Sequence, residues 1–257
     1  MKMRRQNGPE AMVRSIYRKL TRAWGPQHWW PAETPFEVIV GAILGQNTSW
    51  TNVERALASL RSANALTVDA IRCLPIAKLE QLVRSSGYYR QKAQRLKSFV
   101  DFVDGHYSGS LERMFATSTE QLRNQLLSLK GIGHETADAI LLYAGNHEIF
   151  VVDAYARRIL ERHAAIESSA RYDDLRALVE RALRRQIPEQ ANSTTPVLPP
   201  GLIVHQPSLM SATQRAPLAQ VYNEMHGLLV QIGKHYCFKQ EPDCEQCPLR
   251  SLLPDRS

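Results

Sequence analysis

Residues 119–144 read "TEQLRNQLLSLKGIGHETADAILLYA", and this stretch decides the fold. Apolar residues recur at three- and four-residue spacing on both sides of "KGIGHE", which predicts two helices joined by a tight turn. Gly131 and Gly133 permit positive φ and carry no Cβ, so neighbouring N–H groups at the start of the second helix can bind a phosphate. The stretch is also typical of an ordinary helix–helix turn with glycine caps, and spacing alone favours that simpler interpretation.

The rest of the chain repeats the helical pattern, whereas the alternation typical of strands is nearly absent. Thr119 is the expected N-cap of the first hairpin helix, and Gly87 and Gly145 stand where helices are expected to end. No internal repeat of fixed period is present. The chain is therefore predicted to be all-α, with further helices expected over residues 52–63, 79–87, 91–107, 153–165, 172–187 and 218–236.

Composition limits the classes of protein that fit. The 257 residues suffice for one large domain or two lobes, and 32 Lys+Arg against 25 Asp+Glu give a net charge of +7 that favours an anionic partner such as nucleic acid. No apolar run is long enough to span a bilayer, and the N-terminus lacks the apolar stretch of a signal peptide. A cytoplasmic protein with no membrane partner is expected. Residues 188–217, rich in Pro, Ser and Thr, are interpreted as an inserted loop between helices.

A second informative stretch follows the hairpin, where residues 147–163 read "HEIFVVDAYARRILERH". A short apolar run ends at Asp153, and a basic helix carrying Arg157 and Arg158 begins there. Asp is among the best N-cap residues, so Asp153 is expected to cap this helix. The same geometry would hold its carboxylate at the mouth of a cleft, and the two roles are compatible.

The ordered motifs together resemble the endonuclease III superfamily of DNA glycosylases, with its helix-hairpin-helix, Gly/Pro-rich loop and aspartate. Four stretches carry the resemblance: "LKGIGHETADAIL", "VVDAYARRI", "PFEVIVGAILGQNTSWTNVERAL" and "SSGYYRQKAQRLKSF". The resemblance implies an all-α, two-lobed fold with an active cleft between the lobes. Residues 36–147 would form a six-helix barrel with the hairpin. Residues 1–35 plus 148–257 would form the second lobe, with the catalytic aspartate, the insertion and a cysteine loop.

The resemblance also implies roles for individual residues and a partner, double-stranded DNA containing a damaged base. Asp153 corresponds to the catalytic aspartate, and Gln46 to a residue that helps fill the gap left by the flipped base. The hairpin would grip the DNA backbone, often with a monovalent cation, through Gly131, Ile132 and Gly133. A monomer acting at the nucleoid is expected.

Basic residues near these motifs have two interpretations. Lys92, Lys130, Arg157 and Arg158 can neutralise phosphates, or they can be ordinary solvated charges.

Glu135 occupies the hairpin position at which bifunctional members of the superfamily carry a lysine. That lysine attacks C1′ of the sugar and later cuts the strand through a Schiff base, and a carboxylate has no amine with which to do so. The sequence therefore predicts base release without strong cleavage of the abasic site.

The segment "WWP", Trp29 to Pro31, resembles the 3-methyladenine glycosylase branch when taken with the other motifs. In that branch aromatic residues here sandwich an alkylated purine, so Trp29, Trp30 and Pro31 are candidates for the base pocket. Tryptophans in this position are otherwise typical of a core. An N3- or N7-alkylated purine already carries positive charge and leaves readily, which suits a site without a lysine. Electron-rich rings would favour such a cation by about 0.5 to 2 kcal/mol each.

Three of the four cysteines cluster near the C-terminus with the spacing Cys237-x6-Cys244-x2-Cys247. This spacing resembles the four-cysteine [4Fe-4S] loop of endonuclease III, but Leu253 stands at the fourth position. A non-Cys or water ligand could complete a cluster, another ion such as zinc could bind, or the loop could be metal-free. Cys73 lies in a separate apolar pattern and is expected to be a buried core residue.

The predicted function is that of a monofunctional base-excision repair glycosylase for alkylated purines such as 3-methyladenine. Three alternatives remain open. The first is a uracil or mismatched-thymine glycosylase. The second is an oxidised-pyrimidine glycosylase with AP lyase activity that uses Lys130. The third is a non-enzymatic protein that binds damaged DNA through the hairpin alone.

Overall fold

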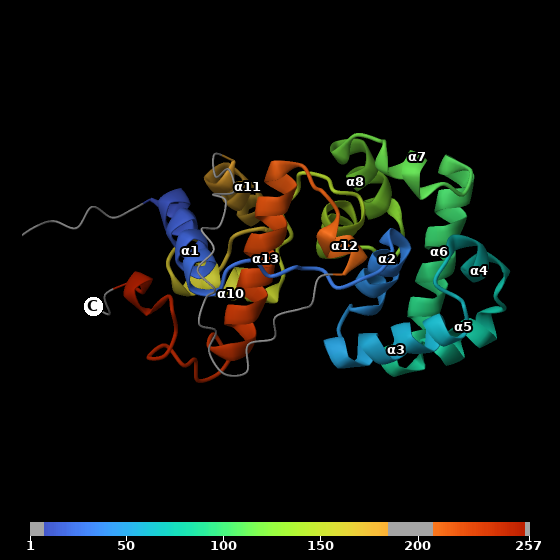
Figure 1. Cartoon of the computed structure of the whole chain (residues 1–257), viewed down its shortest axis with the longest axis horizontal. Helices are drawn as coiled ribbons and strands as arrows, with labels where there is room; N and C mark the ends of the chain where they lie inside the picture. The colour runs from blue at the N-terminus through green and yellow to red at the C-terminus, as the bar shows by residue number, and fades with distance from the viewer. Residues whose placement is uncertain (1–7, 185–207, 255–257) are drawn as a thin grey trace, which may run out of the picture. The chain divides into compact units, whose positions relative to one another are not determined.

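The computed structural model describes residues 8–184 and 208–254, and every regular element within these residues is helical (Figure 1). The predicted all-α class is confirmed. In chain order the elements are α1 (Pro9–Trp24), α2 (Pro35–Leu44), α3 (Trp50–Ser62), α4 (Val68–Cys73), α5 (Ile76–Leu82), η1 (Arg84–Ser86), α6 (Tyr89–Tyr107), α7 (Leu111–Phe115), α8 (Thr119–Ser128), α9 (His134–Ala139), η2 (Ile140–Ala144), α10 (Ala154–Arg162), α11 (Tyr172–Leu183), α12 (Leu209–Ala212), α13 (Pro217–His235) and η3 (Arg250–Leu252).

The chain divides into two compact units. One unit is Ala32–His147, and the other combines Met1–Pro31 with Glu148–Ser257. The described segments before and after the Ala32–His147 unit, residues 8–31 and those from 148 on, therefore belong to the same unit.

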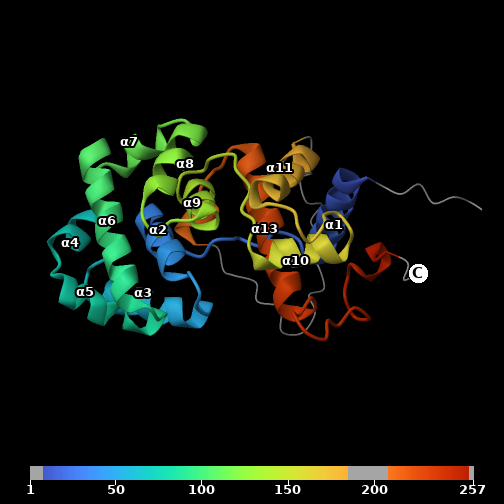
Figure 2. The ribbon, with the colours of Figure 1, turned by 180° about the vertical axis from the view of Figure 1, so that it is seen from behind.

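In the Ala32–His147 unit, the long helix α6 is flanked by α4 and α5, as the two opposite views agree (Figures 1 and 2). Helix α2 is buried along its whole length from Phe36 and packs against α3, α6, α9 and η2. Thr34 caps α2 by accepting a hydrogen bond from the Glu37 amide at 3.1 Å. The buried Glu37 carboxylate pairs with Arg61 of α3, which ties the first two helices of the unit together.

In the other unit, α13 is the central helix and packs against α1, α10 and α11. Helix α1 turns a buried stripe of Val13, Ile16, Leu20 and Trp24 inward, the spacing expected of an amphipathic helix. Trp24 stacks on Tyr236, with ring centroids 6.1 Å apart and planes 20° from parallel. The N-terminal segment is thereby packed against the C-terminal part of the same unit.

Three local predictions need correction. The N-cap of α8 is Ser118, whose hydroxyl accepts from the Gln121 amide at 3.4 Å, so Thr119 is the first helical residue. Within the expected loop 188–217, the described part contains the short helix α12, which begins with a capping box of Ser208 and Ser211. Residues 188–207 lie outside the described residues. Cys73 is exposed at the end of α4, because the apolar face of that short helix buries only Ile71.

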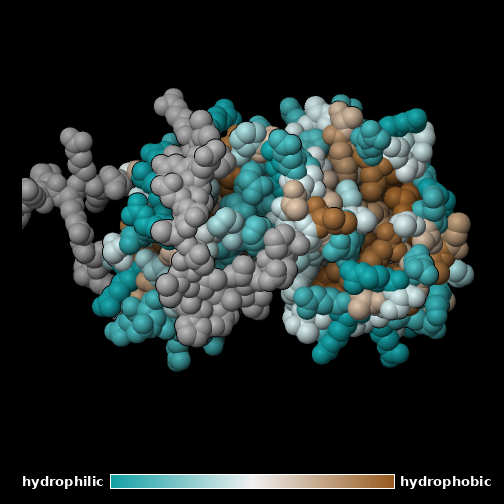
Figure 3. Space-filling view, in the orientation of Figure 1, coloured by the Kyte–Doolittle hydropathy of each residue, from teal (hydrophilic) through white to brown (hydrophobic). Residues whose placement is uncertain are grey.

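On the face shown in Figure 3, hydrophobic residues of the Ala32–His147 unit form a visible patch bordered by hydrophilic residues. Among the described helices none is long and apolar enough to cross a membrane.

Candidate active site and DNA-binding hairpin

The predicted helix-hairpin-helix is formed by α8, the turn Leu129–Gly133 and α9. Gly131 has φ +89°, a conformation that favours glycine, whereas Gly133 has φ −97° and does not need it. Ile132 between them is buried, its amide donating to the Leu129 carbonyl at 3.0 Å, while both glycines are exposed. The turn is thus anchored by one apolar side chain and presents bare backbone to solvent.

A buried ion pair holds the two hairpin helices together. Arg123 of α8 donates to both carboxylate oxygens of Asp138 on α9, at 2.6 and 3.2 Å, and Asp138 is fully buried. A fully buried carboxylate would be costly without such a partner. The pair therefore sets the distance and angle between α8 and α9.

Gln46, from the turn after α2, is bound to the hairpin. Its amide donates to the Gly131 carbonyl at 2.9 Å and to the Thr136 hydroxyl at 2.8 Å, and its oxygen accepts from Arg95 of α6. The Arg95 guanidinium also fills the space beside Gly131, where an added Cβ would lie 2.2 Å from Nε. The predicted role of Gln46 at the gap left by a flipped base stays a prediction, as does a monovalent cation at the hairpin.

Glu135, the residue at the lyase-lysine position, lies exposed in the first turn of α9. Lys130, the nearest lysine in the hairpin sequence, is also exposed, in the turn after α8. Both residues are exposed, as are Gly131 and Gly133.

Asp153 is the N-cap of α10, as predicted, and its Oδ1 accepts from the Ala156 amide at 2.7 Å. The extended segment before it is buried, and its amides are bonded by α11 side chains: Phe150 N donates to Glu180 at 3.0 Å and Val152 N to the Tyr172 hydroxyl at 3.3 Å. The position of the carboxylate is therefore set from both sides.

The second carboxylate oxygen of Asp153 faces His226 of α13, with Nε2 3.5 Å from Oδ2. Burial acts to raise the pKa of Asp153. The charge and hydrogen bonding of His226, together with the Ala156 and Tyr155 amides, outweigh it, so the pKa lies below its ordinary value. Asp153 is thus an ionised carboxylate at neutral pH, only 14% exposed at its side chain.

Helix α13 also holds the tryptophan segment. Trp29 packs on His226 with ring centroids 6.0 Å apart, and the Asn223 amide donates to the Trp29 carbonyl at 2.5 Å. At Gly227 an added Cβ would lie 3.1 Å from the Trp29 Cβ, so the missing side chain lets the segment approach the helix. Trp29 and Trp30 meet edge to face at 5.9 Å and 75°, and both remain partly exposed with Pro31. The two rings therefore do not form a parallel pair.

The basic residues expected to contact phosphates differ in their exposure and in their bonds within the protein. Lys92 is buried, and its ammonium donates to the Leu44 and Ser86 carbonyls at 2.9 and 2.6 Å, so its predicted phosphate contact is wrong. Arg157 donates to the Ala170 carbonyl at 2.7 Å and is only partly exposed. Arg158 donates to the Cys237 and Gly233 carbonyls at 2.8 and 3.3 Å and lies over the Tyr155 ring. DNA contacts by Arg157 and Lys130 stay predictions.

Residues 40–185, more than half of the chain, match the family model of the HhH-GPD superfamily base excision DNA repair proteins. The chain belongs to this superfamily. It is therefore a base-excision repair DNA glycosylase, an enzyme that acts on N-glycosyl bonds, and the alternative of a purely DNA-binding protein falls away.

Individual relatives agree with this family. A Methanocaldococcus jannaschii protein named as a "putative DNA repair glycosylase" is 38% identical over 94% of this chain and 95% of its own length. Endonuclease III of Bacillus subtilis is 25% identical over 85% of this chain and 80% of its own.

Solved structures share the fold of this glycosylase. The H. pylori 3-methyladenine DNA glycosylase bound to 1,N6-ethenoadenine aligns with a TM-score of 0.67 at 31% identity, covering 89% of this chain and 98% of that one. A non-covalent endonuclease III–DNA complex aligns with a TM-score of 0.69 at 18% identity, covering 95% and 94%, which shows the fold alone.

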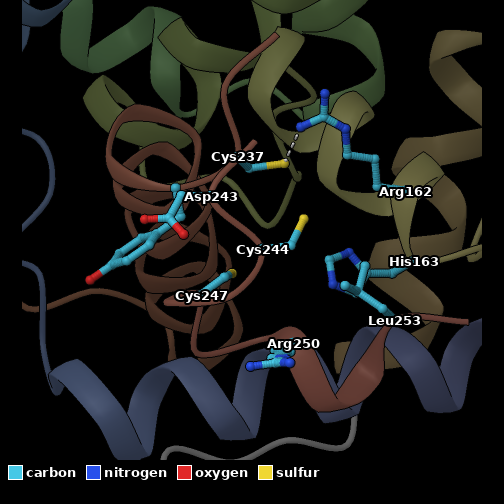
Figure 4. Close-up of a pocket in the computed structure, with 9 residues that line it drawn as sticks. Arg162, His163, Cys237, Asp243, Cys244, Cys247, Arg250 and Leu253 are labelled. Carbon is cyan, nitrogen blue, oxygen red and sulfur yellow. Dashed lines mark hydrogen bonds between the residues drawn. The ribbon is translucent and has the colours of Figure 1, made fainter. Parts of the chain in front are cut away.

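The three clustered cysteines of the glycosylase line one pocket between the ends of α10 and α13 and the C-terminal loop (Figure 4). Cys237 is buried, and Cys244 and Cys247 are partly buried. Leu253, at the position expected for a fourth cysteine, lines the same pocket. Among the described residues, no group of three or more His, Cys, Asp or Glu side chains is arranged to hold a single metal ion.

Three contributors to these sites were not predicted from the sequence. They are His226 beside Asp153, Arg95 beside the hairpin, and His163 in the cysteine pocket. His226 lies within "NEMHGLL", where its place on the apolar face of α13 is the one available signal.

Proposed function

We propose that this glycosylase is monofunctional and hydrolyses the N-glycosidic bond of alkylated purines such as 3-methyladenine in DNA. The observation that carries the proposal is the grouping of Asp153, His226 and Trp29 around α13 within one compact unit. A negative carboxylate thus lies close to aromatic rings that are accessible to a base.

The chemistry asked of such a site is modest. A purine alkylated at N3 or N7 carries positive charge, so breaking its bond to C1′ returns the electron pair to the ring and neutralises it. The Asp153 carboxylate would stabilise the positive charge that develops on the sugar and orient a water. The water oxygen bonds to C1′ as the base leaves, and its proton passes to solvent.

Recognition of a cationic base would rest on the tryptophan segment. An aromatic face attracts a cation by about 0.5 to 2 kcal/mol, a preference that a neutral normal purine does not share. Because the Trp29 and Trp30 rings are perpendicular, one of them would stack on the base while the other met its edge. The 31% identical H. pylori structure, a 3-methyladenine glycosylase, supports the same substrate class.

The absence of lyase activity rests on Glu135. Its carboxylate cannot form the Schiff base through which bifunctional members cut the strand. The second candidate function, an oxidised-pyrimidine glycosylase and lyase, would need Lys130, whose exposed ammonium lies in the hairpin turn.

The proposal is tested with duplexes that each carry one base: 3-methyladenine, 7-methylguanine, hypoxanthine, uracil, mispaired thymine or thymine glycol. Chromatography of the released base should show product from the alkylated purines and little from the others. Faster release of uracil, thymine or thymine glycol would overturn the substrate assignment.

Borohydride trapping separates the two mechanisms. We expect no covalent protein–DNA adduct from the wild-type protein during base release. An adduct that disappears in Lys130→Ala would establish the lyase alternative instead, whereas one that persists in Lys130→Ala would assign the nucleophile to another amine and equally overturn the monofunctional mechanism.

A further inference from the structure

The cysteine pocket contains a fourth potential metal ligand that the spacing of the sequence does not indicate. His163, the C-cap residue of α10, lines the pocket with Cys237, Cys244 and Cys247, and Figure 4 shows its ring beside Leu253. Leu253 has no donor atom, so the loop supplies three cysteine ligands, and its Asp243 also lines the pocket. His163 comes from a helix far earlier in the chain.

The hydrogen bonding of His163 leaves one ring nitrogen ready to coordinate. Nδ1 lies 2.8 Å from the Ile159 carbonyl, which can only accept, so Nδ1 carries the hydrogen and Nε2 presents a lone pair. His163 is 3% exposed, and among the described residues Nε2 has no hydrogen bond that meets the usual distance and angle limits. A buried nitrogen in this state is the form in which histidine binds metals, with its other nitrogen fixed by a carbonyl.

Arg162 fixes the cysteine loop beside His163. Its guanidinium donates to the Cys237 sulfur at 3.1 Å and to the Lys239 carbonyl at 3.1 Å. Because Arg162 immediately precedes His163, these two bonds hold the loop next to the histidine ring.

The donor set offers one ligand to each of several irons. Five His, Cys or Asp side chains with donor atoms line the pocket, His163, Cys237, Asp243, Cys244 and Cys247, and no three of the described His, Cys, Asp or Glu side chains are grouped to hold one metal ion. A single zinc requires such a grouping, whereas each iron of a [4Fe-4S] cluster takes its own protein ligand. We propose that His163 Nε2 is the fourth ligand, with Cys237, Cys244 and Cys247, of a [4Fe-4S] cluster in this pocket.

Binding the cluster would release the thiol protons to solvent and leave the histidine neutral. An oxidised cluster of charge +2 with three thiolates then carries a net charge of about −1, against about −2 with four. Less negative charge raises the reduction potential, as replacing cysteine by histidine does in Rieske centres. The cluster would hold the C-terminal loop and take no part in breaking the glycosidic bond, so this inference does not depend on the substrate.

The first test uses the wild-type protein, purified without oxygen and supplied with equal amounts of ferric and ferrous iron and with sulfide. Expected results are a visible charge-transfer band, iron and sulfide in equal amounts, and a pulsed EPR signal of the reduced cluster coupled to one ¹⁴N nucleus. Absence of that coupling in a loaded cluster would overturn the assignment of His163. Binding of zinc without iron and sulfide, or of neither, would overturn the cluster itself.

The second test uses variants that change one ligand at a time. His163→Asn keeps an amide near the place of Nδ1 but removes Nε2, and we expect iron content and the visible band to fall to background. Adding Leu253→Cys to that variant should restore the band without ¹⁴N coupling. His163→Cys should keep the cluster and lower its reduction potential.

His235→Gln is the matched control, because His235 lies two residues before Cys237 but does not line the pocket. It should leave iron content, coupling and potential unchanged. Circular dichroism confirms that each variant is folded. Full iron content in a folded His163→Asn protein would contradict the proposal.

Discussion

Asp153 is held in place by a helix N-terminus and a histidine, and both contacts favour its charged form. Asp153→Asn keeps the shape and the cap but removes the negative charge that would stabilise the sugar cation. We expect single-turnover base release to fall by about 10² to 10³-fold, the scale of losing one electrostatic group, with duplex binding retained. Glu161→Gln, an exposed acid on the same helix, should react at the wild-type rate. Comparable turnover by Asp153→Asn would remove Asp153 from the mechanism.

His226 is expected to act through Asp153 as a positioning residue. Because His226 holds the pKa of Asp153 down, the wild-type carboxylate stays ionised as the pH falls and is protonated only below its ordinary value. In His226→Leu the Asp153 pKa should rise, so base release should be lost at a higher pH on the acid side. The pH–rate profile measures this shift. The pH at which His226→Gln loses base release should lie between the values for the wild type and for His226→Leu. A slower reaction with an unmoved acid limb would indicate a purely structural role.

Lys92 links the stability of the fold to pH. Burial, and then the charge of Arg95, lowers the Lys92 pKa to about 8, whereas the unfolded chain has an ordinary lysine near 10.4. Between these values the unfolded state binds more protons, so this residue makes the free energy of unfolding rise with pH, by at most about 1.4 kcal/mol per pH unit.

Denaturant unfolding between pH 8 and 10.5 measures the effect. Lys92→Met is the reference: it loses two bonds to carbonyls and should be less stable by about 1 to 3 kcal/mol, but without this rise. Parallel curves for the two proteins would show that Lys92 is charged in the folded state throughout.

At the scale of elements, the two glycines of the hairpin turn differ in whether the fold requires them. Gly131 has positive φ and lies against Arg95, so Gly131→Ala meets both backbone strain and a collision. We expect it to lower the free energy of unfolding by about 1 to 3 kcal/mol. Gly133 has an extended backbone, and an added Cβ would meet nothing within 4 Å. Gly133→Ala should therefore have the same free energy of unfolding as the wild-type protein.

The Gly133→Ala variant isolates contact with DNA from contact within the protein. If the backbone at Gly133 approaches a phosphate, the added methyl group should weaken binding to duplex DNA in fluorescence anisotropy while stability is unchanged. Wild-type affinity in this variant would show that the hairpin glycine does not face the DNA backbone.

At the scale of the whole molecule, the charge of +7 predicts salt-dependent binding. The logarithm of the association constant for undamaged duplex should fall linearly with the logarithm of salt concentration, with a slope set by the number of phosphates contacted. If Lys130 contacts a phosphate, Lys130→Gln should reduce the magnitude of the slope by about 1, the amount expected for one lost phosphate contact. Lys19→Gln is the control: it removes one positive charge at an exposed position of α1 and should leave the slope unchanged.

Local features of this protein were predictable because neighbouring residues determine them. The helices follow from apolar spacing, and the cap at Asp153 follows from its place before a helical run. The absence of a lysine at Glu135 and of a fourth cysteine at Leu253 is also visible in the chain alone. The cap of α8 was misplaced by one residue, because Ser118 and Thr119 are both good caps.

The partners of these residues were decided by tertiary structure. Three contacts join segments far apart in the chain: His226 beside Asp153, His163 beside the cysteines, and Lys92 bonded to the Leu44 carbonyl. Periodicity shows that a side chain faces inward, but the group it meets depends on how helices pack, and that is a property of the folded chain. The all-α class and the types of the candidate reactive groups follow from the residues and their spacing alone. Packing around α13 and at the end of α10 decided which side chains these groups contact.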